Sequence, residues 1–216
     1  MIRPEVLIVD YGVGNLFSVY SALDYLNAKP VISNNPEDIR KYQKVILPGV
    51  GAFENGMSAL KKNGADQALS EVKKKGTSIL AICLGMQMLL DESEEFGIHK
   101  GLGFIPGKVK RIPEFNQSGK KIKIPHIGWS EIYFPDGVNI KSNKYLLGFE
   151  KLRASFYFVH SYQAKPNDLN DTVANCNYEG IEITAIIQKE NVTGCQFHPE
   201  KSGKSGLLLL ENFISI

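Results

Sequence analysis

A cysteine stands where two different sequence patterns meet. Residues 79–83 form an apolar run that is typical of a buried strand, and a stretch with helical spacing follows Gly85. A strand, a sharp turn and a helix around a small-x-nucleophile-x-Gly motif make a nucleophile elbow, which here spans Ala81 to Gly85. Such a turn is strained and projects its side chain from the sheet edge. Cys83 is therefore a candidate nucleophile, and the alternative is an inert buried thiol.

A cysteine nucleophile needs a general base, and His198 is the best candidate. It follows an apolar strand-like run, and Glu200 stands two residues beyond it with Pro199 between them. A rigid turn of this kind can aim an imidazole together with the carboxylate that orients it. A histidine at a strand end more often caps a loop, but its presence beside the elbow, at the strand ends of one sheet, favours a catalytic pair.

The remaining histidines and cysteines are weaker candidates. His99 lies in a charged loop and is expected to be solvated, whereas His126 and His160 follow strand-like runs and could be structural. Cys176 and Cys195 lack a glycine elbow, so we expect both in strands. Three cysteines, an odd number in a chain of 216 residues, argue against a disulfide framework and indicate a reducing compartment.

Two glycine-rich segments, residues 10–16 and 47–53, follow predicted strands. Each contains Gly-x-Gly, but Phe17 and Glu54 stand where a dinucleotide-binding fingerprint has its third glycine. The pattern therefore argues against a nucleotide cofactor. The backbone amides of residues 49–51 could instead supply an oxyanion donor beside the elbow, because glycines allow unusual peptide orientations.

The elements that must position these groups begin with three short apolar runs, at residues 6–10, 45–49 and 79–83. Strands without polar alternation are buried on both faces, which is typical of a central parallel sheet. The second half carries six further strand candidates without an obvious helix until residues 206–213; they are residues 107–112, 121–129, 155–164, 171–178, 183–188 and 192–199. We expect them to extend the sheet in antiparallel fashion and to form a small additional sheet.

Helical spacing separates the first strands. One helix is predicted from Leu16 with Asn15 as its N-cap, and a second helical region over residues 55–76 is predicted to break near Gly64 and to end at Gly76. There is no internal repeat, low-complexity tract or linker. The sequence therefore predicts one α/β domain over residues 1–216.

Bulk composition excludes several classes of function. Hydrophobic residues make up 43% of the chain, charged residues 22%, and the net charge of +2 gives no nucleic-acid signature. The amino terminus enters a strand directly and is no signal peptide, and the apolar carboxyl end is too short to cross a bilayer. We therefore expect a cytoplasmic protein without nucleic-acid or membrane partners.

Five segments of the chain carry a specific resemblance. They are CLGMQ (83–87), LPGVGAF (47–53), PHIGW (125–129), YFVHSY (157–162) and QFHPEKS (196–202). Together they resemble the class-I (triad) glutamine amidotransferases and, within them, the glutaminase subunits of imidazole glycerol phosphate synthase, over practically the whole chain. The resemblance implies a three-layer α/β fold with a mostly parallel central sheet and a small additional antiparallel sheet.

The resemblance also implies a reaction. Cys83 would attack the side-chain amide of glutamine, His198 would pass the proton to departing ammonia, and Glu200 would orient His198. The oxyanion would be held by backbone amides of Leu84, Gly49, Val50 and Gly51. Glutamine would be held by Gln87, Glu95, Ser161 and Tyr162. No cofactor and no metal is implied.

Free ammonia is protonated and lost in water, so a glutaminase of this kind must dock onto its acceptor enzyme. The resemblance implies a (β/α)8-barrel cyclase subunit (HisF-like) as the partner in a heterodimer. Positions at or near that interface would be Asn15, Trp129 and Lys201. For two residues a structural alternative stays open: Glu95 could belong to an acidic helix end, and a lone tryptophan such as Trp129 is more often in a core.

Three departures from the family pattern bear on the acceptor. Ala81 replaces a usual glycine in the elbow, Ser130 replaces a common asparagine, and Gln163 stands where an aromatic or basic residue is commoner. None removes the triad, but the last two lie on the partner side. Alternatives therefore stay open: a paralogous glutaminase subunit that supplies a sugar amidotransferase in surface-polysaccharide biosynthesis, a different cysteine hydrolase, or a non-catalytic binding module on the same fold.

Overall fold

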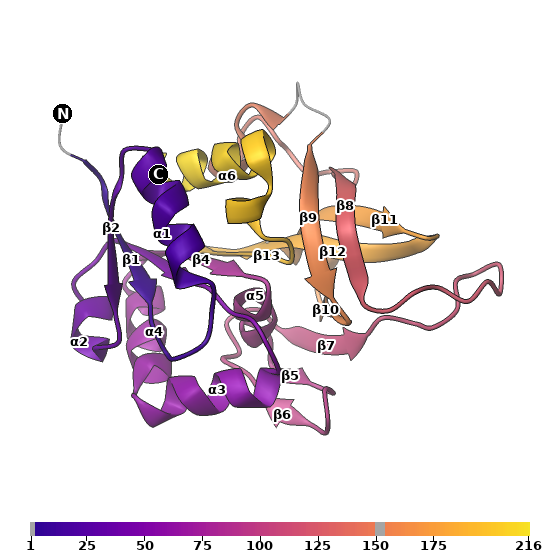
Figure 1. Cartoon of the computed structure of the whole chain (residues 1–216), viewed down its shortest axis with the longest axis horizontal. Coiled ribbons are helices and arrows are strands. Elements are labelled where there is room, and N and C mark those ends of the chain that lie inside the picture. The colour runs from indigo at the N-terminus through magenta and orange to yellow at the C-terminus, as the bar shows by residue number, and fades with distance from the viewer. Residues whose placement is uncertain (1–2, 150–153) are drawn as a thin grey trace.

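A nine-stranded sheet forms the centre of the computed structural model, which describes residues 3–149 and 154–216 (Figure 1). Its strand order is β2-β1-β3-β4-β13-β12-β11-β8-β9. The first five strands in this order are parallel to one another; they are β2 (Lys29–Ser33), β1 (Glu5–Val9), β3 (Lys44–Leu47), β4 (Ser78–Ile82) and β13 (Val192–Cys195). The three apolar runs thus form the predicted parallel strands β1, β3 and β4.

The rest of the sheet is antiparallel, as predicted for the second half of the chain. It consists of β12 (Ile181–Lys189), β11 (Thr172–Tyr178), β8 (His126–Tyr133) and β9 (Ser155–His160). The prediction is wrong for β13, which also comes from that half but pairs with β4 in parallel. Strand β8 begins at His126, later than the predicted start at residue 121.

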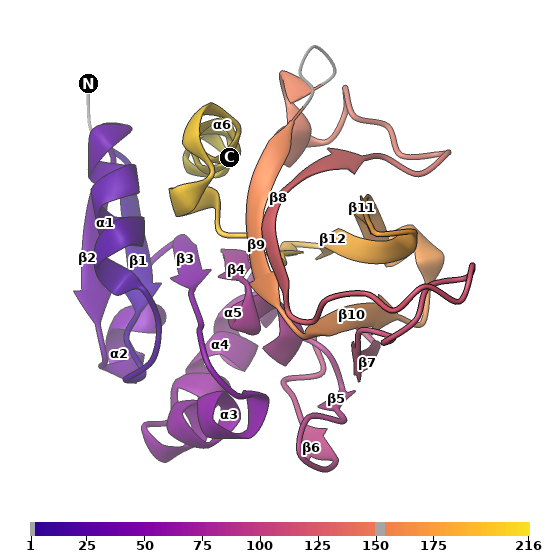
Figure 2. The ribbon, with the colours of Figure 1, turned by 45° about the vertical axis from the view of Figure 1, so that its right-hand side comes forward.

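A second sheet of four strands has the order β10-β7-β5-β6. Its strands are β10 (Tyr162–Pro166), β7 (Gly107–Arg111), β5 (Glu92–Ser93) and β6 (His99–Lys100). The β10–β7 and β5–β6 pairs are antiparallel and the β5–β7 pair is parallel. The predicted strand over 155–164 is divided at Ser161, because β9 belongs to the large sheet and β10 to the small one; Figure 2 shows the chain turning between them.

Helices cover both faces of the parallel strands and complete the three layers (Figure 1). One face carries α1 (Leu16–Tyr25) and α6 (Gly203–Ser215); the other carries α2 (Pro36–Ile39), α3 (Phe53–Lys62), α4 (Ala65–Lys74) and α5 (Leu84–Met88). The run of apolar residues 6–9 in β1 is explained by burial of both faces of the strand. Val6 and Ile8 pack in the cluster under α1 and α6, whereas Leu7 and Val9 pack in the cluster under the other helices. Short 3-10 helices are η1 (Lys144–Leu146), η3 (Leu169–Asp171) and η4 (Pro199–Lys201).

The helix boundaries follow the glycine signals in the sequence. Gly64 separates α3 from α4 with a φ of 74°, and Gly76 follows α4 with a φ of 85°. Asn15 is the N-cap residue of α1, as predicted, but its side chain accepts no hydrogen bond from the amides of the first turn.

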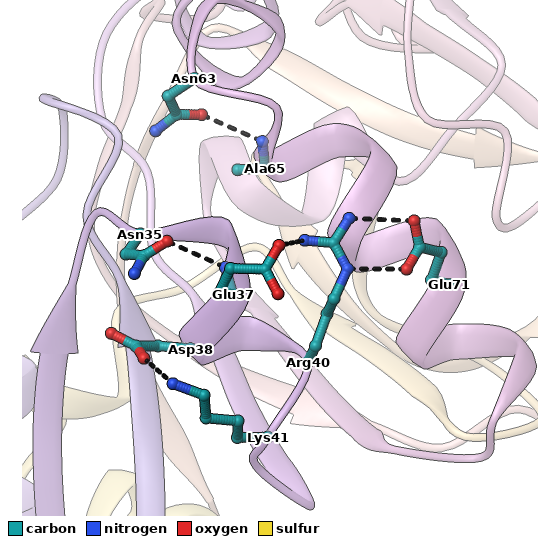
Figure 3. A network of polar contacts seen from close by, with 8 residues as sticks. All are labelled: Asn35, Glu37, Asp38, Arg40, Lys41, Asn63, Ala65 and Glu71. Atoms are coloured by element: carbon teal, nitrogen blue, oxygen red, sulfur yellow. Dashed lines mark hydrogen bonds and ion pairs between the residues drawn. The ribbon is translucent and has the colours of Figure 1, made fainter.

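Helices α2 and α4 are joined at the surface by a polar network (Figure 3). The guanidinium of Arg40 donates two hydrogen bonds to the carboxylate of Glu71, at 2.7 and 3.0 Å, and a third to Glu37. Asn35 caps the start of α2 through the amide of Glu37. This network orients two helices on the face that also carries α5.

Within the described residues, the structure has no helix that is both long and apolar enough to span a membrane.

Candidate active site

Cys83 lies on the turn between β4 and α5, as the elbow pattern predicts. Its backbone has φ 55° and ψ −110°, a strained conformation for a residue with a side chain. Gly85 allows the turn to sit close to β3, because a Cβ atom there would lie 2.1 Å from the carbonyl oxygen of Leu47. Cys83 is buried, with 7% of its surface exposed, and it borders a cavity. The fold thus places a cysteine with a strained backbone at the carboxyl edge of the parallel strands, beside that cavity.

His198 and Glu200 form the buried ion pair that the sequence predicted. The Nδ1 atom of His198 lies 2.8 Å from Oε1 of Glu200, and the two side chains are 3% and 1% exposed. Nδ1 is therefore engaged, and Nε2 is left for the cysteine. The backbone of His198 is fixed as well, because its amide donates to the carbonyl of Tyr157 at 3.0 Å and Ser202 donates to its carbonyl.

The electrostatics of this group favour a charged imidazole. Burial opposes the charge on His198, but hydrogen bonds to Cys83 and Glu200 and their negative charges outweigh it and raise the pKa of His198 to about 10. A protonated His198 beside the sulfur can hold a thiolate and later donate its proton to a leaving group. Cys83, His198 and Glu200 can thus perform nucleophilic catalysis.

One cavity of about 250 Å³ collects most of the predicted site residues. Those that line it are Cys83, Leu84, Val50, Gly51, Gln87, Glu95, Ser161, Tyr162 and His198. Glu200, which contacts His198, and Gly49 are predicted site residues that do not line the cavity. A wider hollow of about 610 Å³, lined by residues of the 138–145 and 188–191 segments, contains none of the predicted residues. The lining residues, and not the cavity volume, therefore identify the site.

The segment over residues 49–51 stands beside the elbow. A Cβ atom at Gly49 would lie 2.8 Å from the amide nitrogen of Gly85 and 2.6 Å from the hydroxyl of Tyr11. That buried hydroxyl donates to the carbonyl of Pro48 at 2.6 Å, and burial, with the charge of Cys83, raises the pKa of Tyr11 well above its usual range. Leu84 opens α5, and the first amides of a helix lack an intrahelical acceptor. Leu84 and the 49–51 segment thus lie beside the elbow, and their role as oxyanion donors stays a prediction.

Gln87 is oriented by its hydrogen bonds. Its amide nitrogen donates to the carbonyl of Tyr162 and to Oε1 of Gln196, both at 3.0 Å. Both protons are used, so the Oε1 atom of Gln87 is the group left for a ligand. The nitrogen of Gln196 lies 3.8 Å from the sulfur of Cys83.

Glu95 reaches the cavity from a loop after β5 and not from a helix, so the alternative of an acidic helix end is wrong. Its Oε2 accepts from the amide of Phe53 at 2.7 Å, at the first turn of α3. The carboxylate is held in place by this bond and keeps its second oxygen for another partner. Ser161 stands at the join of β9 and β10, where its carbonyl accepts from the amide of Ile112.

The predictions for the weaker histidine and cysteine candidates are wrong for His99 and confirmed for the two cysteines. His99 lies in β6, partly buried and 3.7 Å from Glu54, so the prediction of a solvated loop residue is wrong; pairing with β5 withdraws it from solvent. His126 and His160 are buried and hydrogen-bonded to each other at 3.0 Å. The other two cysteines lie in β11 and β13, as predicted, and all three are free thiols.

The residues predicted at a partner interface are accessible. Trp129 is 58% exposed on β8 and packs edge-on against Tyr157, so the alternative of a core tryptophan is wrong. Lys201 is exposed in η4, directly after the triad, and Asn15 is half-buried before α1. Asn15 and Lys201 flank the sheet edge that carries Cys83. Whether a partner binds them stays a prediction.

Sequence reasoning missed two residues of the site, Tyr11 and Gln196. Gln196 lies two residues before His198, and the period of a strand could have placed both on one face. Tyr11 follows β1, whose carboxyl end lies beside that of β3. Among the described residues, no group of three or more His, Cys, Asp or Glu side chains could hold a metal ion.

Comparison with known proteins gives three findings. The family described as glutamine amidotransferase class-I matches residues 7–216. The chain is 43% identical to the imidazole glycerol phosphate synthase subunit HisH 1 of Legionella pneumophila (strain Lens), over 98% of this chain and 99% of that one, and 43% identical to the subunit HisH of Chlorobaculum tepidum, over 96% and 98%. The solved structure of PurLQS from Thermotoga maritima shares the fold with a TM-score of 0.73, at 20% identity over 99% of each chain.

Proposed function

The chain belongs to the class-I glutamine amidotransferase family, and we propose that it is the glutaminase subunit of an imidazole glycerol phosphate synthase. It hydrolyses glutamine to glutamate and passes the ammonia to a (β/α)8-barrel cyclase subunit (HisF-like) within a heterodimer. That partner makes imidazole glycerol phosphate and AICAR in histidine biosynthesis. Relatives of that name at about 40% identity over nearly the full chain support this acceptor over a sugar amidotransferase. The family match over 7–216 supports one amidotransferase domain, and the three free thiols support a cytoplasmic location.

The observation that carries the proposal is the buried His198–Glu200 pair beside the strained Cys83. A raised pKa keeps His198 protonated, so the sulfur attacks the carboxamide carbon of glutamine as a thiolate. The carbonyl oxygen becomes an oxyanion as the C–S bond forms. Backbone amides of Leu84 and of the 49–51 segment stabilise that charge, and one such donor contributes about 10² to 10³ in rate.

Collapse of the intermediate releases ammonia. His198 donates its Nε2 proton to the departing nitrogen as the C–N bond breaks, and a glutamyl thioester remains on Cys83. A water molecule then attacks the thioester while His198 accepts its proton. The C–S bond breaks, and glutamate leaves. Glu200 stabilises the imidazolium before ammonia leaves and again after water is deprotonated, and it orients the neutral ring in between, because its carboxylate stays on Nδ1.

The walls of the cavity suit glutamine as the substrate. The free Oε1 of Gln87 can accept from an N–H group, and the carboxylate of Glu95 suits an ammonium. Ser161 and Tyr162 also line the cavity. A zwitterionic amino acid with a terminal carboxamide satisfies these groups and reaches Cys83. We assign glutamine binding to these four residues.

The test is release of glutamate from glutamine by the purified chain, alone and with the cyclase subunit. We expect release that increases with the cyclase, and labelling of Cys83 by the glutamine-like electrophile diazo-oxo-norleucine. A Cys83→Ser variant is the matched control and should show neither. No glutamate release with the cyclase present would overturn the proposal in favour of a binding module. Labelling by other acyl substrates but not by the glutamine analogue would indicate a different hydrolase.

A further inference from the structure

A chain of hydrogen bonds runs from β8 to His160, which lines the glutamine cavity, and no step of the proposed reaction uses it. The hydroxyl of Ser130 lies 2.9 Å from Nε2 of His126, and Nδ1 of His126 lies 3.0 Å from Nε2 of His160. Nδ1 of His160 lies 2.8 Å from the carbonyl oxygen of Tyr162. The two histidines face each other across the antiparallel β8–β9 pair. The chain therefore connects the interior face of β8 with the wall of the cavity.

The partners fix the direction of every bond in this chain. A carbonyl oxygen only accepts, so His160 carries its proton on Nδ1. In a neutral His160 the Nε2 atom accepts, so His126 also carries its proton on Nδ1. Its Nε2 then accepts from the hydroxyl of Ser130. Each donor has an acceptor, and neither imidazole has a free nitrogen.

Both rings are held in a neutral state by their surroundings. His126 is stacked between Phe158, with ring centroids 4.8 Å apart, and Tyr178, with centroids 4.0 Å apart. Burial lowers the pKa of His126 to about 4. Burial lowers the pKa of His160 to about 3, against the hydrogen bond to Tyr162, and the positive charge of His198 adds to the lowering. A neutral His160 leaves the positive charge of the site on His198.

The chain ends on an atom that also positions Gln87. The carbonyl oxygen of Tyr162 accepts both from His160 and from the amide of Gln87, so the two donors converge on one oxygen. Gln87 in turn bonds Gln196, whose nitrogen lies near the sulfur of Cys83. A shift of His126 would move His160, and with it the carbonyl that sets the orientation of Gln87.

We propose that His126 is a positioning residue for glutamine: through His160 it fixes the Tyr162 carbonyl and thereby the orientation of Gln87 in the cavity. The inference rests on the proposed glutaminase function. His126 touches no reacting atom, so its contribution is to substrate binding in the ground state and transition state alike. Its loss therefore raises KM and leaves kcat nearly unchanged.

The test uses the heterodimer and measures kcat and KM for glutamine in a small set of variants. His126→Phe keeps a flat ring but removes both nitrogens, so we expect KM to rise about tenfold with kcat within about twofold. His126→Asn restores an N–H near the position of Nδ1 and should bring KM to within about threefold of wild type. Ser130→Ala removes only the hydrogen bond from Ser130 to Nε2 of His126. It replaces His126→Phe in the test if that variant does not fold. Its KM should rise about threefold.

The control is Ile132→Val, which removes one methylene group from the same face of β8 and no hydrogen bond. We expect its KM to equal that of wild type. The KM of His126→Phe must exceed that of wild type, of His126→Asn and of Ile132→Val. If it equals any one of these, the inference is overturned, whereas the proposed function stands. A wild-type heterodimer that releases no glutamate would overturn the proposed function and the inference with it. Nitrogen NMR gives a readout independent of activity: His126 is expected in the Nδ1–H tautomer, and an Nε2–H tautomer would contradict the inference.

Discussion

The triad depends on residue types that can be recognised in the sequence and on contacts that cannot. Cys83 before a glycine and His198 before Pro-Glu were predictable, because each follows an apolar strand and the strands end at one edge. Gln196 and Tyr11 gave no comparable signal. Their roles arise from an amide that reaches across to Cys83 and a hydroxyl that reaches to Pro48. Such contacts depend on side-chain packing between strands, which the pattern of a single chain does not specify.

The charge on His198 leads to a prediction at this scale. Burial is the largest influence on the pKa of His198 and lowers it, and hydrogen bonding to Cys83 is the first of the causes that raise it. Cys83→Ser replaces a group that can ionise by one that does not, so the pKa of His198 should fall below about 10. NMR titration of the imidazole measures it. Cys176→Ser, in β11, is the control and should leave the value unchanged. An unchanged pKa in Cys83→Ser would mean that Glu200 alone holds the charge.

The elbow is the element on which the site depends. Its strand and helix follow from the apolar run and the spacing of residues 79–90, whereas the sharpness of the turn follows from contact with β3. The neighbouring wall was harder to predict. Residues 155–164 have strand character throughout, yet the chain changes sheets at Ser161 (Figure 2). Sequence patterns identify strands better than the sheets to which they belong, because sheet membership is set by distant partners.

Gly85→Ala tests the packing of the elbow. Alanine usually stabilises a helix relative to glycine by about 1 kcal/mol, but here its Cβ would meet the carbonyl of Leu47. We expect a loss of about 2 kcal/mol in the free energy of unfolding, measured by denaturant titration. Gly76→Ala is the control, because it has open space around it and should lose only about 1 kcal/mol through its left-handed backbone. A Gly85→Ala protein as stable as wild type would contradict the close contact.

At the scale of the whole molecule, β8 separates two environments. Its interior face carries His126 and Ser130, and its other face carries the exposed Trp129 and Ile127. The prediction that Ser130 lies on the same side as Trp129 is therefore wrong. Exposed large apolar side chains beside a catalytic edge indicate a docking surface. The α/β domain was predictable from the order of the strands and helices, and the three layers followed from the family resemblance. The exposure of Trp129 also followed only from that resemblance, because composition favours a buried tryptophan.

Trp129→Ala should therefore weaken binding of the cyclase subunit by about tenfold, since exposed aromatic residues often dominate interfaces. Calorimetric titration of the cyclase into the glutaminase measures the dissociation constant. Tyr25→Ala is the matched control: Tyr25 is 77% exposed but ends α1, which runs back to the opposite edge of the sheet from Cys83. We expect no change in that variant. If the two substitutions change the dissociation constant equally, the face of β8 that carries Trp129 is not the docking surface.

The central claim is that Cys83 generates ammonia from glutamine for a partner enzyme. The most direct test is synthesis of imidazole glycerol phosphate by the heterodimer with Cys83→Ala, supplied either with glutamine or with ammonium. We predict that synthesis from glutamine is abolished and synthesis from ammonium is retained at the wild-type rate. Loss of both activities would contradict the account, because Cys83 would then maintain the fold or the interface. Synthesis from glutamine that survives the substitution would contradict it as well.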